Sequence, residues 1–256
     1  ATLYGVKGSN GAIVIETKRA KDAETRITAQ ITTGMNLKPS SIPVLDAVQS
    51  KRYLMDVYQS RGYSAGDIQK LPFINDTKPE QHSWGYEGNA DYYRYNKNTD
   101  WQDQLFVQGL KQNYSIGVMG GDDVALYALS LGYLQNEGLV KGTDFSRFSA
   151  RINTDINFSP KFTVQTNMNF VYGKKNLMQE GNASPQNPIY ASLVKSPFMA
   201  GFTYNEQDQL SPNYEEVDLF GMSNPTAIVD NMLQENISYG FFANIHLKYK
   251  IWKELT

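Results

Sequence analysis

The stretch RFSARINTDINFSPKFTVQTNMNFVY, residues 147–172, alternates apolar and polar side chains on either side of a short Ser-Pro-Lys break. Because successive side chains of a β-strand point to opposite faces, this alternation predicts two long strands joined by a tight turn at Ser159-Pro160-Lys161. Each run of about 12 residues exceeds the usual five or six of a soluble strand and suffices for a tilted membrane span.

The two faces of these predicted strands differ in chemistry. The apolar face is expected to meet lipid and carries Phe148, Ile152, Ile156, Phe162, Met168 and Phe170. The polar face is expected to face the interior of a barrel and carries Arg147, Arg151, Asn153, Asp155, Gln165 and Asn167. Apolar-out and polar-in alternation of this length is typical of transmembrane β-barrels.

Four further segments repeat the period, which gives six predicted strands; they are residues 26–35, 114–118, 124–134 and 238–251. Short connections at 120–123, at 159–161 and after Trp252 alternate with long connections at 36–111, 135–145 and 174–236. Spanning barrels alternate short turns on one side with long loops on the other. We therefore predict an all-β chain that forms part of a transmembrane antiparallel β-barrel, since about six strands cannot close one.

The composition excludes several functions. A formal charge of −2 gives no basic surface for nucleic acid, and the absence of cysteine excludes thiolate catalysis and thiolate metal sites. The two histidines, His82 and His246, match no metal-ligand spacing, so we expect no metal and no cofactor. The adjacent carboxylates at 122–123 and 215–216 lack a partner base or nucleophile, so we do not expect an enzyme.

The long connections hold the candidate contact residues. Residues 43–59 have helical spacing of apolar side chains, and residues 84–95 are rich in Gly, Asn and Tyr. The connection 174–236 is aromatic enough to fold, and residues 189–195 are expected to pack on the barrel mouth. We expect exposed loop aromatics to contact either the substrate or a partner, the alternative being a loop that only covers the rim; the candidates are Trp84, Tyr86, Tyr92, Tyr93, Tyr204 and Tyr214.

The chain opens with YGVKGSNGAIVIETK, residues 4–18, whose turn is marked by Gly5, Gly8, Asn10 and Gly11. A phosphate-binding loop needs a strand before its glycines and a helix after them. Here a β-branched run follows Gly11, so the glycines predict a tight turn into a strand and not a nucleotide site.

These segments carry a family resemblance. The opening ATLYGVKGSNGAIVIETK resembles the end of the plug domain of SusC/RagA-type TonB-linked outer-membrane proteins. NTDWQDQLF at 98–106, QNYSIGVMGG at 112–121 and YALSLGYLQNEG at 127–138 are similar to the opening of that family's barrel, in the same order. The resemblance implies that residues 1–22 end a plug and that residues 23–256 begin a 22-stranded barrel, so that the chain is a fragment.

The resemblance also implies a function. It points to TonB-dependent import of oligosaccharides or peptides across a bacterial outer membrane, with a SusD-like surface lipoprotein as a lid. The TonB complex would engage a region upstream of this chain, and lipid would surround the barrel. Two alternatives remain open: a siderophore or cobalamin receptor of the same architecture, and a soluble β-rich carbohydrate-binding or adhesion module.

Overall fold

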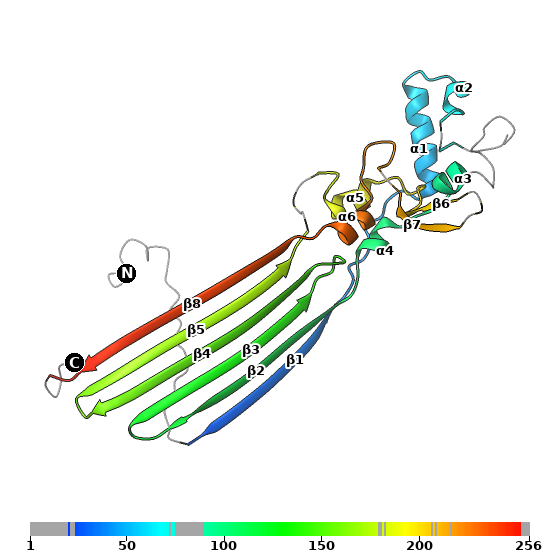
Figure 1. Ribbon diagram of the computed structural model, residues 1–256. Helices are drawn as coiled ribbons and strands as arrows, with labels where there is room; N and C mark the ends of the chain where they lie inside the picture. The colour runs from blue at the N-terminus through cyan, green and yellow to red at the C-terminus, as the bar shows by residue number, and fades with distance from the viewer. Residues whose placement is uncertain are drawn as a thin grey trace.

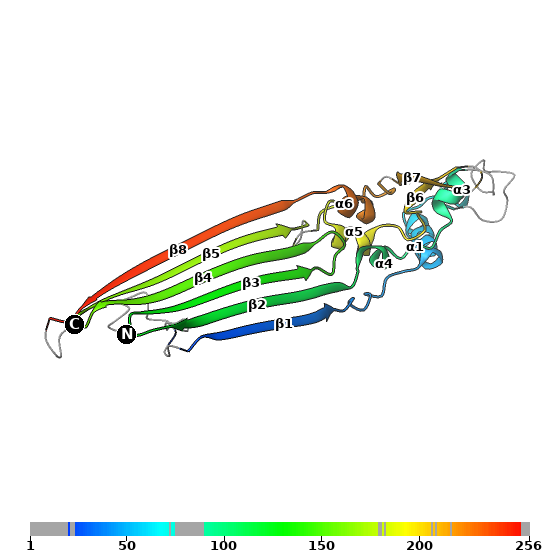
Figure 2. The same cartoon turned by 60° about the horizontal axis from the view of Figure 1, so that its bottom comes forward.

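The computed structural model of the chain describes residues 20, 24–71, 73–74, 90–178, 181, 183–205, 207, 209–215 and 217–251. Figures 1 and 2 show a curved, open sheet of long strands, with the remaining elements gathered beyond one end of it. The sheet has six antiparallel strands in the order β1 (Arg26–Asn36), β2 (Gly109–Gly121), β3 (Ala125–Glu137), β4 (Asp144–Ser159), β5 (Phe162–Asn176) and β8 (Glu235–Tyr249).

The register aligns the apolar positions of all six strands on one face. One row of directly opposed residues crosses the whole sheet and consists of Ile31, Tyr114, Tyr133, Phe148, Tyr172 and Tyr239. The side chains on this face are open to the surroundings, since Ile31 is 69% exposed and Tyr239 is 73% exposed. Because a one-residue slip would turn this row to the other face, the register is specified by the apolar pattern.

Aromatic pairs mark both ends of the apolar face. Tyr172 and Tyr239 lie opposite each other toward the loop end, with ring centroids 5.2 Å apart. Phe158 and Phe162 flank the β4–β5 turn, with centroids 5.8 Å apart. Aromatic side chains at two heights on an apolar face are typical of strands that cross a membrane between its interfaces.

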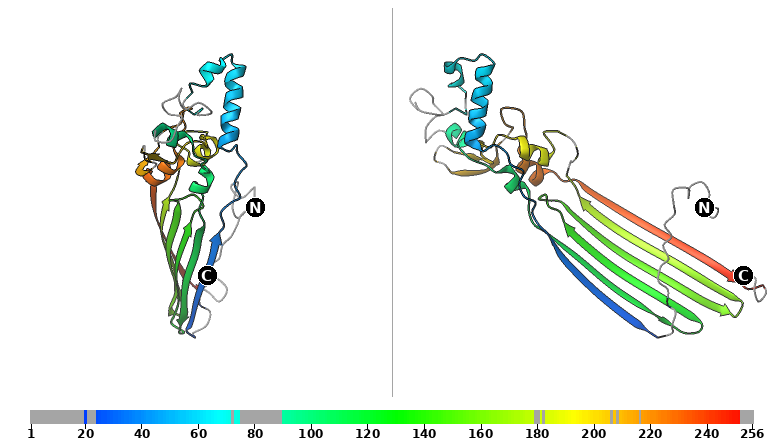
Figure 3. Two further views of the ribbon diagram at one scale, coloured as in Figure 1. Left: turned by 90° about the vertical axis from the view of Figure 1, so that its right-hand side faces the viewer. Right: turned by 180° about the vertical axis from the view of Figure 1, so that it is seen from behind.

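The elements beyond the sheet end form a loop cluster, defined here as the described residues of 37–108 and 177–234. Figure 3 shows this cluster from two further sides. Its helices are α1 (Ala47–Ser60), α2 (Ala65–Ile68), α3 (Ala90–Tyr95), α4 (Trp101–Leu105), α5 (Pro188–Val194) and α6 (Pro225–Asn231). It also holds a two-stranded sheet of β6 (Phe202–Tyr204) and β7 (Leu210–Tyr214).

The hydrophobic cores lie in and beside the loop cluster, not on the sheet. One core gathers residues from both long connections, namely Ala47, Ile68, Phe73, Ile74, Tyr95, Trp101, Phe198 and Met199. A second core joins Leu105, Met178 and Val229 to Val140 of the β3–β4 connection. Rings stack inside the first core, where the centroids of Phe73 and Phe198 are 5.2 Å apart. The expectation that the connection 174–236 folds is thus confirmed.

Several predicted boundaries shift in the structure. The helix predicted from residue 43 begins at Ala47, because Asp46 is its N-cap and forms a capping box with Gln49. Strand β2 runs from Gly109 to Gly121, well beyond the predicted 114–118, since pairing with β1 and β3 overrides the weak alternation at its ends. Residues 90–95, expected to be loop, form α3.

None of the described helices has both the length and the apolar character needed to cross a membrane. The glycine turn at Gly5, Gly8, Asn10 and Gly11 lies outside the described residues, as do Trp84, Tyr86 and Trp252. The boundary between residues 1–22 and 23–256 therefore stays a prediction.

Candidate functional site

The polar face of the sheet collects the residues predicted to face a barrel interior. The register places Asn153 opposite Asn167, and Asp155 opposite Gln165. Arg147 and Arg151 follow on the same face of β4, because they are separated from Asn153 by even numbers of residues. Asn153 is 4% exposed and is buried within this face.

Strand β8 extends these polar rows. Asn244 lies opposite Asn167, and His246 lies opposite Gln165. The row Asn153, Asn167, Asn244 therefore presents three amides side by side, each with donors and an acceptor. Phe242 is an exception to the pattern, since it lies on the polar face opposite Asn169 and is 60% exposed. The alternation of apolar and polar residues did not predict an aromatic side chain at Phe242, because its neighbour Phe241 already occupies the apolar face.

Toward the loop end the polar face is hollowed. A cavity of about 340 Å³ is lined on this face by Thr32, Gly34, Lys111, Asn113, Leu134 and Arg147. Small residues continue the recess, since Ser115, Gly132 and Ser149 lie directly opposite one another across β2, β3 and β4. A Cβ at position 132 would lie 2.9 Å from the Ser149 hydroxyl oxygen, so a larger residue there would require that hydroxyl to move.

Three of the predicted loop aromatics come together in the loop cluster. Tyr92 meets Tyr93 edge-on at a centroid distance of 5.4 Å, and Tyr93 lies 6.5 Å from Tyr204. The ammonium of Lys97 lies over both of the latter rings, 5.6 Å from the centroid of Tyr93 and 4.1 Å from that of Tyr204. Lys97 lies in no sequence motif. It is recognisable as part of this aromatic group only because α3 and β6 are neighbours in the structure.

Tyr214 makes its contacts in a different part of the loop cluster from Tyr92, Tyr93 and Tyr204. Its ring packs on Phe202 with centroids 4.8 Å apart, and its hydroxyl donates a hydrogen bond of 2.5 Å to Asp230 Oδ2. This hydrogen bond to a carboxylate raises the pKa of Tyr214. Tyr214 is therefore engaged inside the loop cluster and is separate from the group around Lys97.

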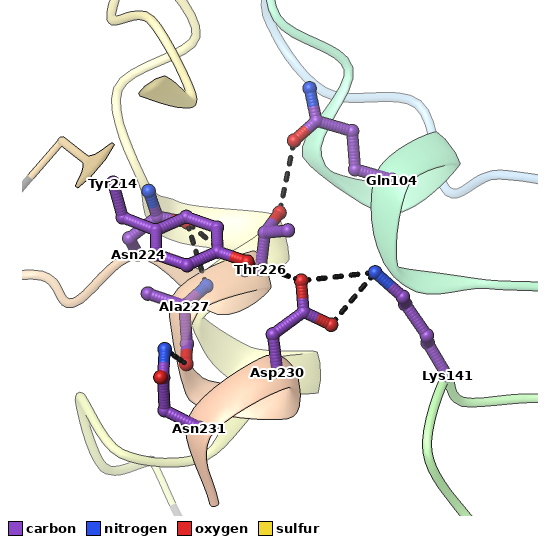
Figure 4. Close-up of polar contacts among 8 residues, drawn as sticks. All are labelled: Gln104, Lys141, Tyr214, Asn224, Thr226, Ala227, Asp230 and Asn231. Atoms are coloured by element: carbon purple, nitrogen blue, oxygen red, sulfur yellow. Dashed lines mark hydrogen bonds and ion pairs between the residues drawn. The ribbon is translucent and has the colours of Figure 1, made fainter. Parts of the chain in front are cut away.

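The network around Asp230 ties three loops together (Figure 4). Asp230 on α6 forms an ion pair of 2.7 Å with Lys141 of the β3–β4 connection. One turn earlier on α6, Thr226 donates to Gln104 of α4 at 2.9 Å. Burial pulls the pKa of Asp230 upward, but hydrogen bonds from Lys141 and Tyr214 outweigh it and leave the pKa below its ordinary value.

A buried carboxylate and a buried ammonium organise the centre of the loop cluster. Asp218 accepts hydrogen bonds from the backbone and hydroxyl of Ser196 and from the backbone of Phe220 and Met222, all between 2.8 and 3.0 Å. Lys195 donates to Met222 O at 3.1 Å, and its ammonium lies 5.4 Å from the ring centroid of Trp101. Burial lowers the pKa of Lys195 to about 8.

A cavity of about 630 Å³ lies in this cluster between α1 and α5. Its wall includes Tyr53, Trp101, Val194 and Phe220. Among the described residues no group of three or more His, Asp or Glu side chains is placed to hold a metal ion. The described residues therefore offer hydrogen-bonding groups on the polar face of the sheet and aromatic side chains in the loop cluster.

Comparison with known proteins finds similarity to TonB-dependent receptors. No family model matches the sequence. The chain is 27% identical to the TonB-dependent receptor SusC of Bacteroides thetaiotaomicron, over 97% of this chain and 23% of SusC. It is 25% identical to a TonB-dependent receptor of Formosa agariphila, over 96% of this chain and 22% of that receptor. The chain thus spans less than a quarter of the length of these relatives.

Solved structures show the same fold. The chain is similar to part of the RagAB peptide transporter, with a TM-score of 0.72 at 18% identity over 98% of this chain and 29% of that chain. The closed-closed state of the RagAB peptide importer gives a TM-score of 0.71 at 19% identity, over 98% of this chain and 29% of that chain. These similarities confirm the predicted resemblance to SusC/RagA-type proteins and the reading of the sheet as part of a barrel.

Proposed function

We propose that the chain forms one segment of an outer-membrane barrel that imports oligosaccharides or peptides in a TonB-dependent manner. The observation that carries the proposal is the apolar row that runs in register across all six strands, backed by a polar face and continued at one end by a folded loop cluster. A soluble module would have to expose that whole apolar face to water, where monomers rarely expose more than a few hundred Å² of contiguous apolar surface.

The proposal assigns a role to each surface. The apolar face meets lipid, and the polar rows around Asn153 and Asn167 face a lumen that holds a plug, of which residues 1–22 are the end. The loop cluster lies outside the cell, where it contacts the substrate or a SusD-like lipoprotein that covers the barrel. The TonB complex acts through a region upstream of this chain. The similarity to SusC and to RagAB supports import of glycans or peptides.

A siderophore or cobalamin receptor is the nearest competing function. The order of the segments at 98–106, 112–121 and 127–138 favours the SusC/RagA type. The similarity to SusC across 97% of the chain includes all three segments and supports the same choice.

Deletion of residues 205–214 in the full-length protein tests the proposal. This segment includes β7 and ends at Tyr214, so its removal takes away Tyr214 without touching a strand of the six-stranded sheet. We expect glycan or peptide uptake, or co-purification of the lipoprotein, to be lost while heat-modifiable gel mobility still reports a folded barrel. Uptake and lipoprotein binding that both persist would show that the segment only covers the rim.

A further inference from the structure

The Lys97 ammonium occupies a site built from two aromatic rings that belong to different loops. Tyr93 lies on α3 and Tyr204 ends β6, and Figure 1 shows these two elements side by side. Their ring planes are tilted by 31° to each other at a centroid distance of 6.5 Å. Lys97 lies within 6 Å of both centroids, which is the range of cation–π attraction. We call Tyr93 and Tyr204 the aromatic clamp.

Backbone contacts hold the two halves of the clamp together independently of the Lys97 side chain. The amide of Lys97 donates to Phe198 O at 3.2 Å, and the amide of Thr99 donates to Pro197 O at 2.8 Å. The amide of Ala200 donates in the other direction, to Arg94 O at 3.0 Å. The segments that carry the two rings are therefore fixed side by side, so the clamp is preorganised by backbone contacts and not by the Lys97 side chain alone.

The clamp is also within reach of solvent. Tyr93, Tyr204 and Lys97 are all half-buried, in contrast to Tyr95 and Phe198 of the neighbouring core. The ammonium lies over both rings at once, and a cation held against aromatic faces is the arrangement by which proteins recognise cationic ligands. A guanidinium suits such a site better than an ammonium, because it is planar, stacks on aromatic faces and is more weakly hydrated.

We propose that the aromatic clamp binds a cationic side chain of a peptide, arginine in preference, and that Lys97 fills the clamp until such a guest displaces it. The proposal rests on the proposed import function in one respect, that the guest belongs to an imported peptide; a neutral oligosaccharide brings no cation. Lys97 then acts as an internal competitor, so that only a peptide with a suitable cation can displace it and occupy the clamp.

The alternative is that Lys97 only fastens the two segments together. The two readings differ in what happens when the lysine is shortened. If Lys97 only holds the two segments together, shortening it loosens the loop and adds no affinity for a cationic peptide. If Lys97 is an internal competitor, shortening it opens the clamp to such a peptide. Because a partly desolvated cation–π contact is worth about 1 to 2 kcal/mol, opening the clamp should raise the affinity for an arginine peptide roughly tenfold.

The test measures binding by fluorescence anisotropy on the purified full-length protein in detergent. Two labelled probes are compared, Ala-Ala-Arg-Ala-Ala and the same peptide with citrulline, which keeps the shape of arginine and removes its charge. We expect Lys97→Ala to bind the arginine peptide about tenfold more tightly than the wild type and to gain nothing for the citrulline peptide. Lys97→Arg, which refills the clamp, should show no gain.

Two further variants complete the design. Tyr204→Leu in the Lys97→Ala background should remove the gain. Lys175→Ala is the matched control, because the Lys175 ammonium lies 5.6 Å from a single ring, that of Phe145, and should change neither probe's affinity.

The proposal is overturned if Lys97→Ala binds both probes equally, or if its gain survives Tyr204→Leu. If Tyr204→Leu does not fold, the affinities of the two probes for Lys97→Ala and Lys97→Arg still test the proposal. Since the assay involves no transport, a failure of import leaves this result unaffected, and a failure here leaves import standing.

Discussion

Replacing Ile152 with arginine should destabilise the folded protein strongly, because Ile152 lies midway along β4 on the apolar face. It is opposed by Leu129 on β3 and by Met168 on β5, and its side chain is 43% exposed on the isolated sheet. An arginine on a lipid-facing position near the midplane of a barrel costs about 2 to 4 kcal/mol. A change of about 2 to 4 kcal/mol alters the folding equilibrium constant roughly 30- to 900-fold.

The matched control is Asn244→Arg. Asn244 lies one residue away in depth, since its neighbour Ala243 shares the row of Ile152 and Met168, but it is on the polar face. We expect this control to cost less than about 1 kcal/mol, because a lumen is polar and hydrated. Urea-dependent folding of the full-length protein into phospholipid vesicles, read by heat-modifiable gel mobility, measures both variants. Equal costs at the two sites would refute the assignment of the faces.

Three further predictions concern sidedness and the loop cluster. A cysteine at Ser211 in the full-length protein should react with an impermeant maleimide on intact cells, while one at Ser159, in the turn at the other end of the sheet, should not; the opposite labelling would invert the topology. Asp218→Leu should destabilise the loop cluster by at least about 3 kcal/mol, since the amides of Ser196, Phe220 and Met222 lose their acceptor, as measured by the urea midpoint of tryptophan fluorescence; an unchanged midpoint would contradict this. The free energy of unfolding of the cluster should rise between about pH 8 and pH 10.5, because burial lowers the pKa of both Lys195 and Lys51 to about 8 from 10.5 and the unfolded chain binds the extra protons in that window; Lys195→Met should reduce the slope of this rise by about half, and an equal slope in the variant would refute the cause.

The sheet was predictable from sequence because one periodicity specifies it. Alternation at 147–172 gave β4, β5 and both faces, and the observed pairing of Ile152 with Met168 and of Asn153 with Asn167 confirms that the two apolar runs share one face. The ends of the strands were less predictable. At Gly109 and Asn176 the composition no longer alternates, and pairing with a neighbouring strand decides where the strand stops.

The sequence predicted that the loop cluster folds, but it did not predict how the elements of the cluster are arranged. Its aromatic content indicated a core, yet the contact between Phe73 and Phe198 joins two connections separated by four strands of the sheet. The same long-range packing brings Lys97 to Tyr204 and Lys141 to Asp230. Local periodicity carries no information about such pairs, so the separation of Tyr214 from the other candidate aromatics emerged only from the structure.

The most direct test of the account is a nitroxide accessibility scan along β4 of the full-length protein in lipid bilayers. Single cysteines at positions 148 to 156 carry the spin label, and collision rates with lipid-soluble oxygen and with a water-soluble nickel complex are compared. We predict a period of two, with oxygen collisions highest at Phe148, Ile152 and Ile156 and lowest at Arg151, Asn153 and Asp155. Oxygen collisions that show no alternation, or that peak on the polar face, would contradict the claim that this sheet is a membrane wall with its apolar row in lipid.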